Sequence, residues 1–317
     1  MSRKTSAVIR IVTWSLLAVF LLGILVVGLR GGSFFNFHLP FTGFNGSLGY
    51  ANSEEYTVGG GSVDMQGIQD IELNWNSGNV NITSYDGSQI TFDETSERSL
   101  EENQRIRYLV RNGKLTIQFC APYRNFGFWH VNIPGKTLEM KVPKALADSL
   151  KEFEISGVSA AIHADGISAK KLVVDSVSGS SNLKNIRADT LEMDTVSGEI
   201  DASQVIVEAL SISGVSGDIS FRGEANRMDT DSVSGKTKVD SSLCPDRVNM
   251  SAVSGDLCLT IPDNAGFTAG YDSVSGDFTN DFPGSSKKGK AIYKDGGASF
   301  DFDTVSGDIE IKQSGSF

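Results

Sequence analysis

Histidine and cysteine are scarce in this sequence of 317 residues, which has three of each. The cysteines, Cys120, Cys244 and Cys258, do not have the spacing of a metal-binding motif, and an odd number cannot all pair within one chain. A Cys244–Cys258 disulfide and unpaired buried thiols both stay open. The sequence also lacks a phosphate-binding glycine loop, a zinc motif and a nucleophile elbow. We therefore predict no catalytic residue, no bound cofactor and no metal ligand, and a protein that is not an enzyme.

Basic residues are outnumbered as well, with 28 Lys and Arg against 39 Asp and Glu and a net charge of −11. Four of the bases, Arg3, Lys4, Arg10 and Arg30, lie in the first thirty residues, which contain no acid. The rest of the chain is therefore more acidic still. Because an acidic body repels nucleic acid, we expect no nucleic-acid partner.

A single long apolar run, residues 11–29, stands near the N-terminus and is long enough for a helix of about 28 Å, which can span a bilayer. Bases precede it, so the positive-inside rule places the N-terminus in the cytoplasm and the body outside. We predict a short cytoplasmic segment (1–10), a transmembrane signal anchor (11–29) and a juxtamembrane linker (30–56). The alternative is a cleaved signal peptide.

The tripeptide Val-Ser-Gly, with Ala for Gly in the first copy, recurs through the second half of the chain. Its copies begin at Val158, Val177, Val196, Val215, Val233, Val253, Val274 and Val305. They are spaced by 19, 19, 19, 18, 20, 21 and 31 residues. A period near 20 is typical of a solenoid, in which each coil is too small to bury its own apolar face and stacks on its neighbours.

Apolar residues alternate on both sides of the repeat valine. The positions five and three before it are mostly apolar, as in Leu191 and Met193, and so are those four and six after it, as in Ile200 and Ala202. This period of two predicts a short strand with one buried face on each side. We predict that the chain bends between the two strands, with the valine as a corner core residue and the glycine permitting the bend.

These patterns predict an all-β fold. We expect a β-solenoid, similar to a single-stranded β-helix, with coils of about 19–21 residues and an N-terminal antiparallel β cap, preceded by one transmembrane helix. The serines that follow the valines would form a hydroxyl ladder along one corner. Because no histidine recurs with them, we expect this ladder to be structural and not catalytic.

Residues 57–152 differ from the regular repeats, which we place at 153–317. Residues 71–82 fit the repeat template with Asn76 in the valine position, so we interpret them as a degenerate coil. Strand patterns at 89–92 and 138–142 and a hairpin around Asn112-Gly113 complete this region. We expect these strands to cap the solenoid, because an uncapped end exposes apolar residues and a strand edge.

Two segments that break the repeat are candidate binding sites. The first, at 123–130, is rich in aromatic residues, and the second, inside the 31-residue spacing, is the one basic cluster of the acidic body. The candidate contacts with a ligand or partner are Tyr123, Arg124, Phe126, Phe128, Trp129, Lys287, Lys288 and Lys290. The alternatives are a packed cap loop for the first segment and a solvated loop for the second.

Acidic residues recur beside the corner, two residues before the valine and three after it, as in Asp194 and Glu199. Three interpretations stay open: solvated carboxylates, Ca²⁺ bridging between coils, and a polysaccharide-cleaving site. Ser180 and Lys236 interrupt the second row, and the nonapeptide calcium motif is absent. Calcium is therefore a cofactor that we keep open without a motif to support it.

Repeated Ser-Gly-Asp units carry a resemblance to a known family. They are Ser216-Gly217-Asp218-Ile219, Ser254-Gly255-Asp256-Leu257 and Ser306-Gly307-Asp308-Ile309. With the upstream Gly78–Ile82 segment and the strand ending in Val142-Pro143, the chain resembles DUF4097, a bacterial putative-adhesin family, over roughly residues 57–313. The resemblance implies a β-helix-like body, frequently anchored in the membrane, with some members encoded near envelope stress systems. It supplies no established catalytic residue.

Together these features predict an adhesin-like binding or scaffold protein of the bacterial cell envelope, with a possible link to envelope stress. It would be held in the cytoplasmic membrane by residues 11–29, with its body outside and a cell-wall glycan or an envelope protein as its partner. The alternatives are a carbohydrate-active enzyme on a β-helix and a self-assembling envelope scaffold. The latter rests on a final strand at 309–311 that has no obvious cap.

Overall fold

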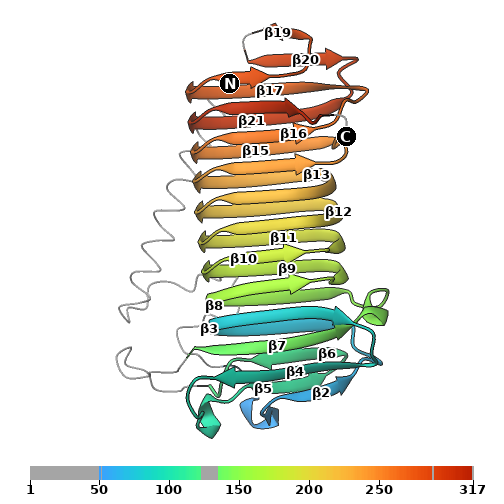
Figure 1. Cartoon of the computed structure of the whole chain (residues 1–317), viewed down its shortest axis with the longest axis vertical. Coiled ribbons are helices and arrows are strands. Elements are labelled where there is room, and N and C mark those ends of the chain that lie inside the picture. Colours follow the sequence, from blue (N-terminus) through green and yellow to red (C-terminus); the bar gives the residue numbers. More distant parts are fainter. Residues whose placement is uncertain (1–49, 51, 123–134, 288, 316–317) are drawn as a thin grey trace.

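A computed structural model describes residue 50 and residues 52–122, 135–287 and 289–315. Strands dominate this part, and the helices are three short 3₁₀ turns, η1 (Ser53–Glu55), η2 (Glu102–Gln104) and η3 (Lys144–Leu146). The strands stack into one tall column (Figure 1), which confirms the predicted all-β class. In the part that is described, no helix is long and apolar enough to cross a membrane. The predicted anchor at 11–29 lies outside it.

Each coil of the column has strand segments on both sides of one corner, which is Val-Ser-Gly in most coils, and in the first two coils a single strand runs through the corner. The coil strands are β3 (Asp70–Tyr85), β8 (Glu152–Asp165), β9 (Ser168–Ser178), β10 (Ser181–Lys184), β11 (Arg187–Ser197), β12 (Ile200–Ser216), β13 (Ile219–Ser234), β14 (Thr237–Ser241), β15 (Arg247–Ser254), β16 (Leu257–Ile261), β17 (Gly266–Ser275), β18 (Phe278–Asn280), β21 (Ala298–Ser306) and β22 (Ile309–Gln313). Equivalent strands pair in parallel, so that Leu191 lies between Leu172 and Leu210. Apolar positions of successive coils therefore form continuous columns.

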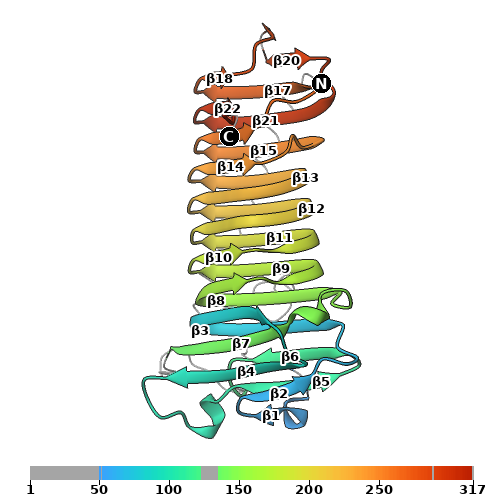
Figure 2. The ribbon, with the colours of Figure 1, turned by 45° about the vertical axis from the view of Figure 1, so that its right-hand side comes forward.

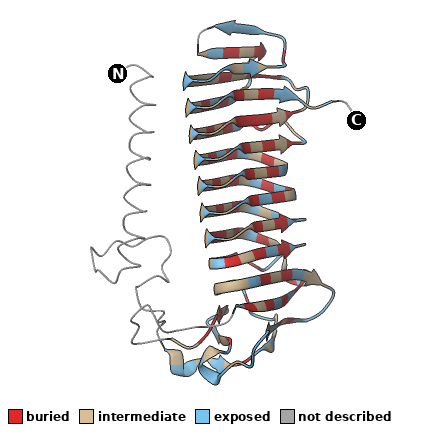
Figure 3. Ribbon diagram, turned by 60° about the vertical axis from the view of Figure 1, so that its left-hand side comes forward, coloured by how far each residue is buried: buried red, intermediate tan, exposed pale blue. Residues whose placement is uncertain are grey.

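The core of the column is one hydrophobic cluster that extends from Ile68 to Ile311. Buried and more exposed residues alternate along the strands (Figure 3), as the period of two predicts. All three cysteines are free thiols, and Cys120 and Cys258 are buried. The Cys244–Cys258 disulfide therefore does not form, and the thiols are part of the packing.

The repeat valine faces outward, which shows that its prediction as a corner core residue was wrong. Seven of the eight valines are partly exposed, and Val274 is 70% exposed. The alternation continues through the valine, and the residue just before it points inward. These inward residues are Gly157, Ser176, Thr195, Gly214, Ser232, Ala252, Ser273 and Thr304. Because all of them are small, we infer that the inside of the corner is narrow, and the β-branched valine occupies the roomier outer side.

The bend comes after the valine, at Ser-Gly, as predicted. Gly217 has a φ of 124°, and a Cβ atom placed on it would lie 2.2 Å from the carbonyl oxygen of Gly198 in the neighbouring coil. Both the left-handed backbone and the close approach therefore require glycine here. The serines before these glycines are exposed and in register, as in Ser178, Ser197 and Ser216, which confirms the hydroxyl ladder.

A cap of six strands covers the first coil (Figure 2). They are β1 (Thr57–Val58), β2 (Gly61–Asp64), β4 (Gln89–Ser96), β5 (Arg107–Arg111), β6 (Lys114–Gln118) and β7 (Lys136–Pro143). The β5–β6 hairpin and the β4–β7 pair are antiparallel, as expected, but β6 and β7 both pair in parallel with β3. Along its other edge β3 pairs with β8. The register sets Asn76 opposite Val158, as the repeat pattern predicted. The cap thus joins the stack through one incomplete coil made of β6 and β7.

The coils do not stack in the order of the sequence at the far end. Strand β21 pairs with both β15 and β17, and β22 pairs with both β16 and β18. The last coil, at Val305, therefore lies between the coils of Val253 and Val274. The spacing of 21 residues before Val274 fits this arrangement, because two extra residues reach about 7 Å, enough to pass one further level of about 4.8 Å.

This order corrects the reason for predicting self-assembly. Strand β22, which contains Ile309–Ile311, has a neighbour on each side and is not an uncapped end. The end of the stack is instead the coil of β17 and β18. There an antiparallel hairpin, β19 (Ser285–Lys287) and β20 (Lys290–Lys294), pairs with part of β17.

Candidate binding surfaces at the corner and the two ends

Acidic side chains form an outward column along one side of the corner, two residues before each valine. In stacking order the column is Ser156, Asp175, Asp194, Ser213, Asp231, Ser251, Asp303 and Asp272. Serine thus occupies three of the eight levels, and at two of them it separates acids. Neighbouring levels are about 4.8 Å apart, at which distance like charges repel.

Three acids of the column have a raised pKa, which favours the neutral form of each carboxyl group. Burial raises the pKa of Asp175 to about 7, and the adjacent Asp194 carboxylate raises it further. Burial also raises the pKa of Asp194 and of Asp231, and hydrogen bonds from Ser213 and Ser251 oppose these two shifts. Within the described residues, no group of three or more His, Cys, Asp or Glu is placed to hold a metal ion. Calcium bridging therefore stays one of the three open interpretations.

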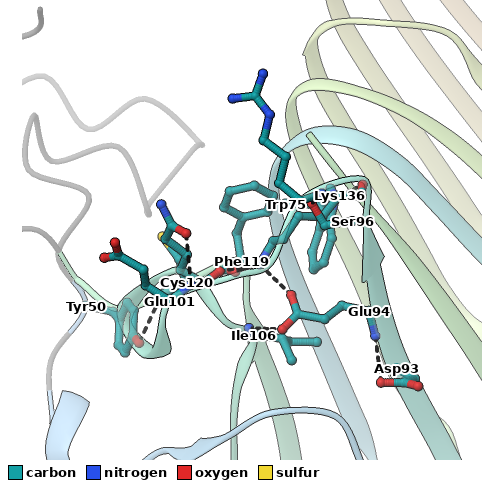
Figure 4. Close-up of polar contacts among 12 residues, drawn as sticks. Tyr50, Trp75, Asp93, Glu94, Ser96, Glu101, Ile106, Phe119, Cys120 and Lys136 are labelled. Atoms are coloured by element: carbon teal, nitrogen blue, oxygen red, sulfur yellow. Dashed lines mark hydrogen bonds and ion pairs between the residues drawn. The ribbon is translucent and has the colours of Figure 1, made fainter. Parts of the chain in front are cut away.

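A buried ion pair lies where the cap meets the first coil (Figure 4). Lys136 Nζ is 2.6 Å from Glu94 Oε2, and the two side chains are 0% and 5% exposed. The ammonium group also donates hydrogen bonds to the carbonyl oxygens of Gln104 and Phe119. Burial lowers the pKa of Lys136, and Glu94 opposes the shift. The pair therefore joins β4 to β7 in a region that excludes water.

Aromatic rings complete this Lys136 cluster, which we define as Trp75, Glu94, Phe119 and Lys136. The Lys136 ammonium is 4.1 Å from the centroid of the Phe119 ring and 5.1 Å from that of Trp75. These two rings meet edge to face at 4.9 Å, and Trp75 Nε1 donates a hydrogen bond to the Lys136 carbonyl at 3.4 Å. Tyr50 donates a hydrogen bond to the carbonyl of Cys120 at 3.1 Å. The cluster thus fixes several backbone segments at one point.

The cluster holds both ends of the segment between β6 and β7. Gln118 in β6 lies opposite Asn74, and Lys136 in β7 lies opposite Gly78, so these two described residues flank the corner of β3. The predicted contacts Tyr123, Arg124, Phe126, Phe128 and Trp129 belong to this segment and lie outside the described residues. The described residues fix where the segment starts and ends.

The basic cluster, the second candidate segment, lies in the β19–β20 hairpin. The alternative interpretation of this segment was a solvated loop. Lys287 and Lys290 are exposed and lie opposite each other in its antiparallel register, and Lys288 lies outside the described residues. The hairpin is at the opposite end of the stack from the Lys136 cluster (Figure 1). The structure therefore does not bring the two candidate segments together.

The Lys136 cluster was not predicted from the sequence. A signal for it exists in the alternation of β7, because Lys136 shares the inward parity of Leu138, Met140 and Val142. A lysine on the inward face of a strand requires a buried partner. That the partner is Glu94, on a different strand, follows only from the three-dimensional pairing.

The family model described as Toastrack DUF4097 matches residues 68–312 of the chain. The comparison with curated proteins finds no match.

Several solved structures are similar at low identity. A putative cell adhesion protein from Clostridium sporogenes is 13% identical, with 82% of this chain and 100% of that chain covered and a TM-score of 0.31. A putative adhesin from Bacteroides fragilis is 9% identical, with 80% of this chain and 97% of that chain covered and a TM-score of 0.45. A putative lipid binding protein from Parabacteroides distasonis is 17% identical, with 80% of this chain and 95% of that chain covered and a TM-score of 0.43.

Proposed function

Because the chain belongs to the Toastrack DUF4097 family, we propose that it is an adhesin-like binding or scaffold protein of the bacterial cell envelope. One observation carries this proposal: the regular repeat is explained by packing, whereas the strands that flank its two interruptions lie at opposite ends of the stack. The inward columns, the corner glycines and the serine ladder have structural roles. Recognition is then a property of the ends, where the chain departs from the repeat.

The proposed location follows from the N-terminal sequence. Residues 11–29 anchor the chain in the cytoplasmic membrane, and Arg3, Lys4 and Arg10 keep the N-terminus inside. The acidic stack then lies outside the membrane, where cell-wall glycans and envelope proteins are within reach.

The cap end is the proposed contact with such a partner. Aromatic side chains bind the apolar faces of sugars and peptides, and the segment with Tyr123, Phe126 and Trp129 is rich in them. The Lys136 cluster supports this role because it fixes both ends of the segment, which lowers the entropy lost on binding. We propose binding and not catalysis, since the corner acids lie along a column and do not meet in one groove.

The test measures binding of fluorescent glycan and peptidoglycan fragments to spheroplasts that carry the full-length chain. Intact spheroplasts are expected to bind, and changing Tyr123, Phe126 and Trp129 together to alanine is expected to weaken binding about tenfold or more. The matched variant changes Lys287 and Lys290 to alanine at the other end and should bind like the parent. Binding that appears only after lysis would contradict the topology, and equal binding by the aromatic variant would remove the cap segment as the site.

A further inference from the structure

The terminal coil, formed by β17 and β18, is covered on only half of its outer edge. Strand β20 pairs with Gly266–Gly270 of β17, and Tyr271 donates its backbone N–H to the carbonyl of Gly289. Beyond Tyr271 the hairpin ends. In the described part of the chain, Asp272–Ser275 pairs only with β21, and β18 pairs only with β22. The end of the stack is therefore a step, with a raised hairpin beside an open strand edge.

The open half of the step exposes apolar surface. Val274 is 70% exposed, whereas the equivalent valines of the other coils are covered to a greater extent. Across the corner, the rings of Tyr271 and Phe278 stack at 3.7 Å. An exposed valine beside a strand edge with free backbone groups is a surface on which another strand can pair.

The two halves of the step carry opposite charge. Asp272 and Asp277 lie on the open half, and Lys287 and Lys290 lie on the hairpin. None of these four side chains forms an ion pair within the described residues. Opposite charges thus lie on the two halves of one end of the molecule, without an ion-pair partner among the described residues.

We infer that this end binds the same end of a second copy of the chain, about a two-fold axis perpendicular to the stack. A two-fold interface places the same patch of both subunits in contact, so it requires a surface that is complementary to itself. The step meets this requirement in shape, because the two-fold rotation sets the raised hairpin of one copy over the open edge of the other. It also meets it in charge, because Lys287 and Lys290 of each copy then face the acids of the other.

The geometry distinguishes this closed pair from open-ended assembly. The opposite end of the stack is covered by the cap strands, and the described chain begins there, at Tyr50. A second copy on the terminal step therefore leaves no equivalent step free, and growth stops at two copies. The caps, with their candidate binding segments, point away from the interface at the two far ends.

Charge-swap variants test the inference on the full-length chain in a neutral detergent. One variant carries Lys287→Glu and Lys290→Glu, and the other carries Asp272→Lys and Asp277→Lys. In sedimentation equilibrium the parent is expected to dimerise, and each variant alone to dimerise about tenfold or more weakly, because its hairpin and edge now have the same charge. A mixture of the two variants is expected to regain the parent affinity, because opposite charges face each other again at both contacts.

The matched control changes exposed valines to aspartate, Val274→Asp at the step and Val110→Asp in the cap, where Val110 is 43% exposed. The first should weaken the dimer and the second should not. A parent that stays monomeric at high concentration would overturn the inference. A dimer that forms equally well in both charge variants would also overturn it, since another surface would then hold the two copies together. A mixture of the two charge variants that does not regain the parent affinity would overturn it as well. Loss of glycan binding by the cap variant leaves all these results unchanged, so the two proposals fail separately.

Discussion

Gly217→Ala is expected to destabilise the stack by about 3 kcal/mol, through the addition of one methyl group. Gly217 has a φ of 124°, which costs an alanine roughly 1–2 kcal/mol. The new Cβ would also lie 2.2 Å from the carbonyl oxygen of Gly198, and such overpacking costs roughly 1–3 kcal/mol more. Since the clash is with the backbone of the next coil, the two coils must separate locally.

Gly214 in the same coil provides the control. A Cβ on Gly214 would have its nearest contact at 3.4 Å, with Cδ1 of Ile219, and another coil carries Ala252 at this inward position. Gly214→Ala is therefore expected to change stability by less than about 1 kcal/mol. Urea unfolding and amide hydrogen exchange of both variants measure the difference. Equal costs at the two positions would mean that the corner does not depend on glycine.

Lys136→Met is expected to cost about 3–5 kcal/mol, because it leaves the Glu94 carboxylate buried without its counter-charge. The carbonyls of Gln104 and Phe119 also lose their donor. We expect amide exchange to become faster first at the two ends of the segment between β6 and β7. Changing both partners, Lys136→Met with Glu94→Met, should be less damaging than the single change, since no unpaired charge then remains.

The matched surface pair lies near the other end of β7. Lys144 Nζ is 3.1 Å from Asp86 Oδ2, with side chains 57% and 86% exposed. Lys144→Met is expected to cost less than about 1 kcal/mol. Urea unfolding followed by tryptophan fluorescence compares the variants. If Lys136→Met proved as mild as Lys144→Met, the Lys136 cluster would not be what holds the cap segment.

Much of the fold could be predicted because it depends on local periodicity. The alternation around Leu191 and Ile200, the glycine bend and the Asn112-Gly113 hairpin each follow from a few neighbouring residues. The valine shows where this reasoning failed. Its uniformity was interpreted as burial, but in a stack of identical corners an outward position is equally uniform, and the narrow inner side selects small residues such as Ser176.

The coil order and the Lys136 cluster could not be predicted, since both depend on contacts between distant segments. The spacings of 21 and 31 residues around Val274 indicated a departure from the regular repeat. Spacing alone, however, does not show that the Val305 coil lies between the coils of Val253 and Val274. Likewise, Lys136 and Glu94 are far apart in the sequence, and only the β4–β7 pairing brings them together. Of the candidate sites, the basic segment forms the β19–β20 hairpin, which was not predicted, and its place beside an open edge depends on the coil order.

The central claim, that the last coil lies inside the stack and leaves β17 and β18 at its end, is tested most directly by a disulfide. Cys258 lies opposite Glu310 in the neighbouring strand, and adjacent strands about 4.8 Å apart are within disulfide range. In a Cys244→Ser background, Glu310→Cys is expected to crosslink to Cys258 on mild oxidation, as read by peptide mass spectrometry. Thr279→Cys, one level beyond Glu310, should not. A Cys258 crosslink to position 279 and none to position 310 would show coils stacked in sequence order and contradict the account.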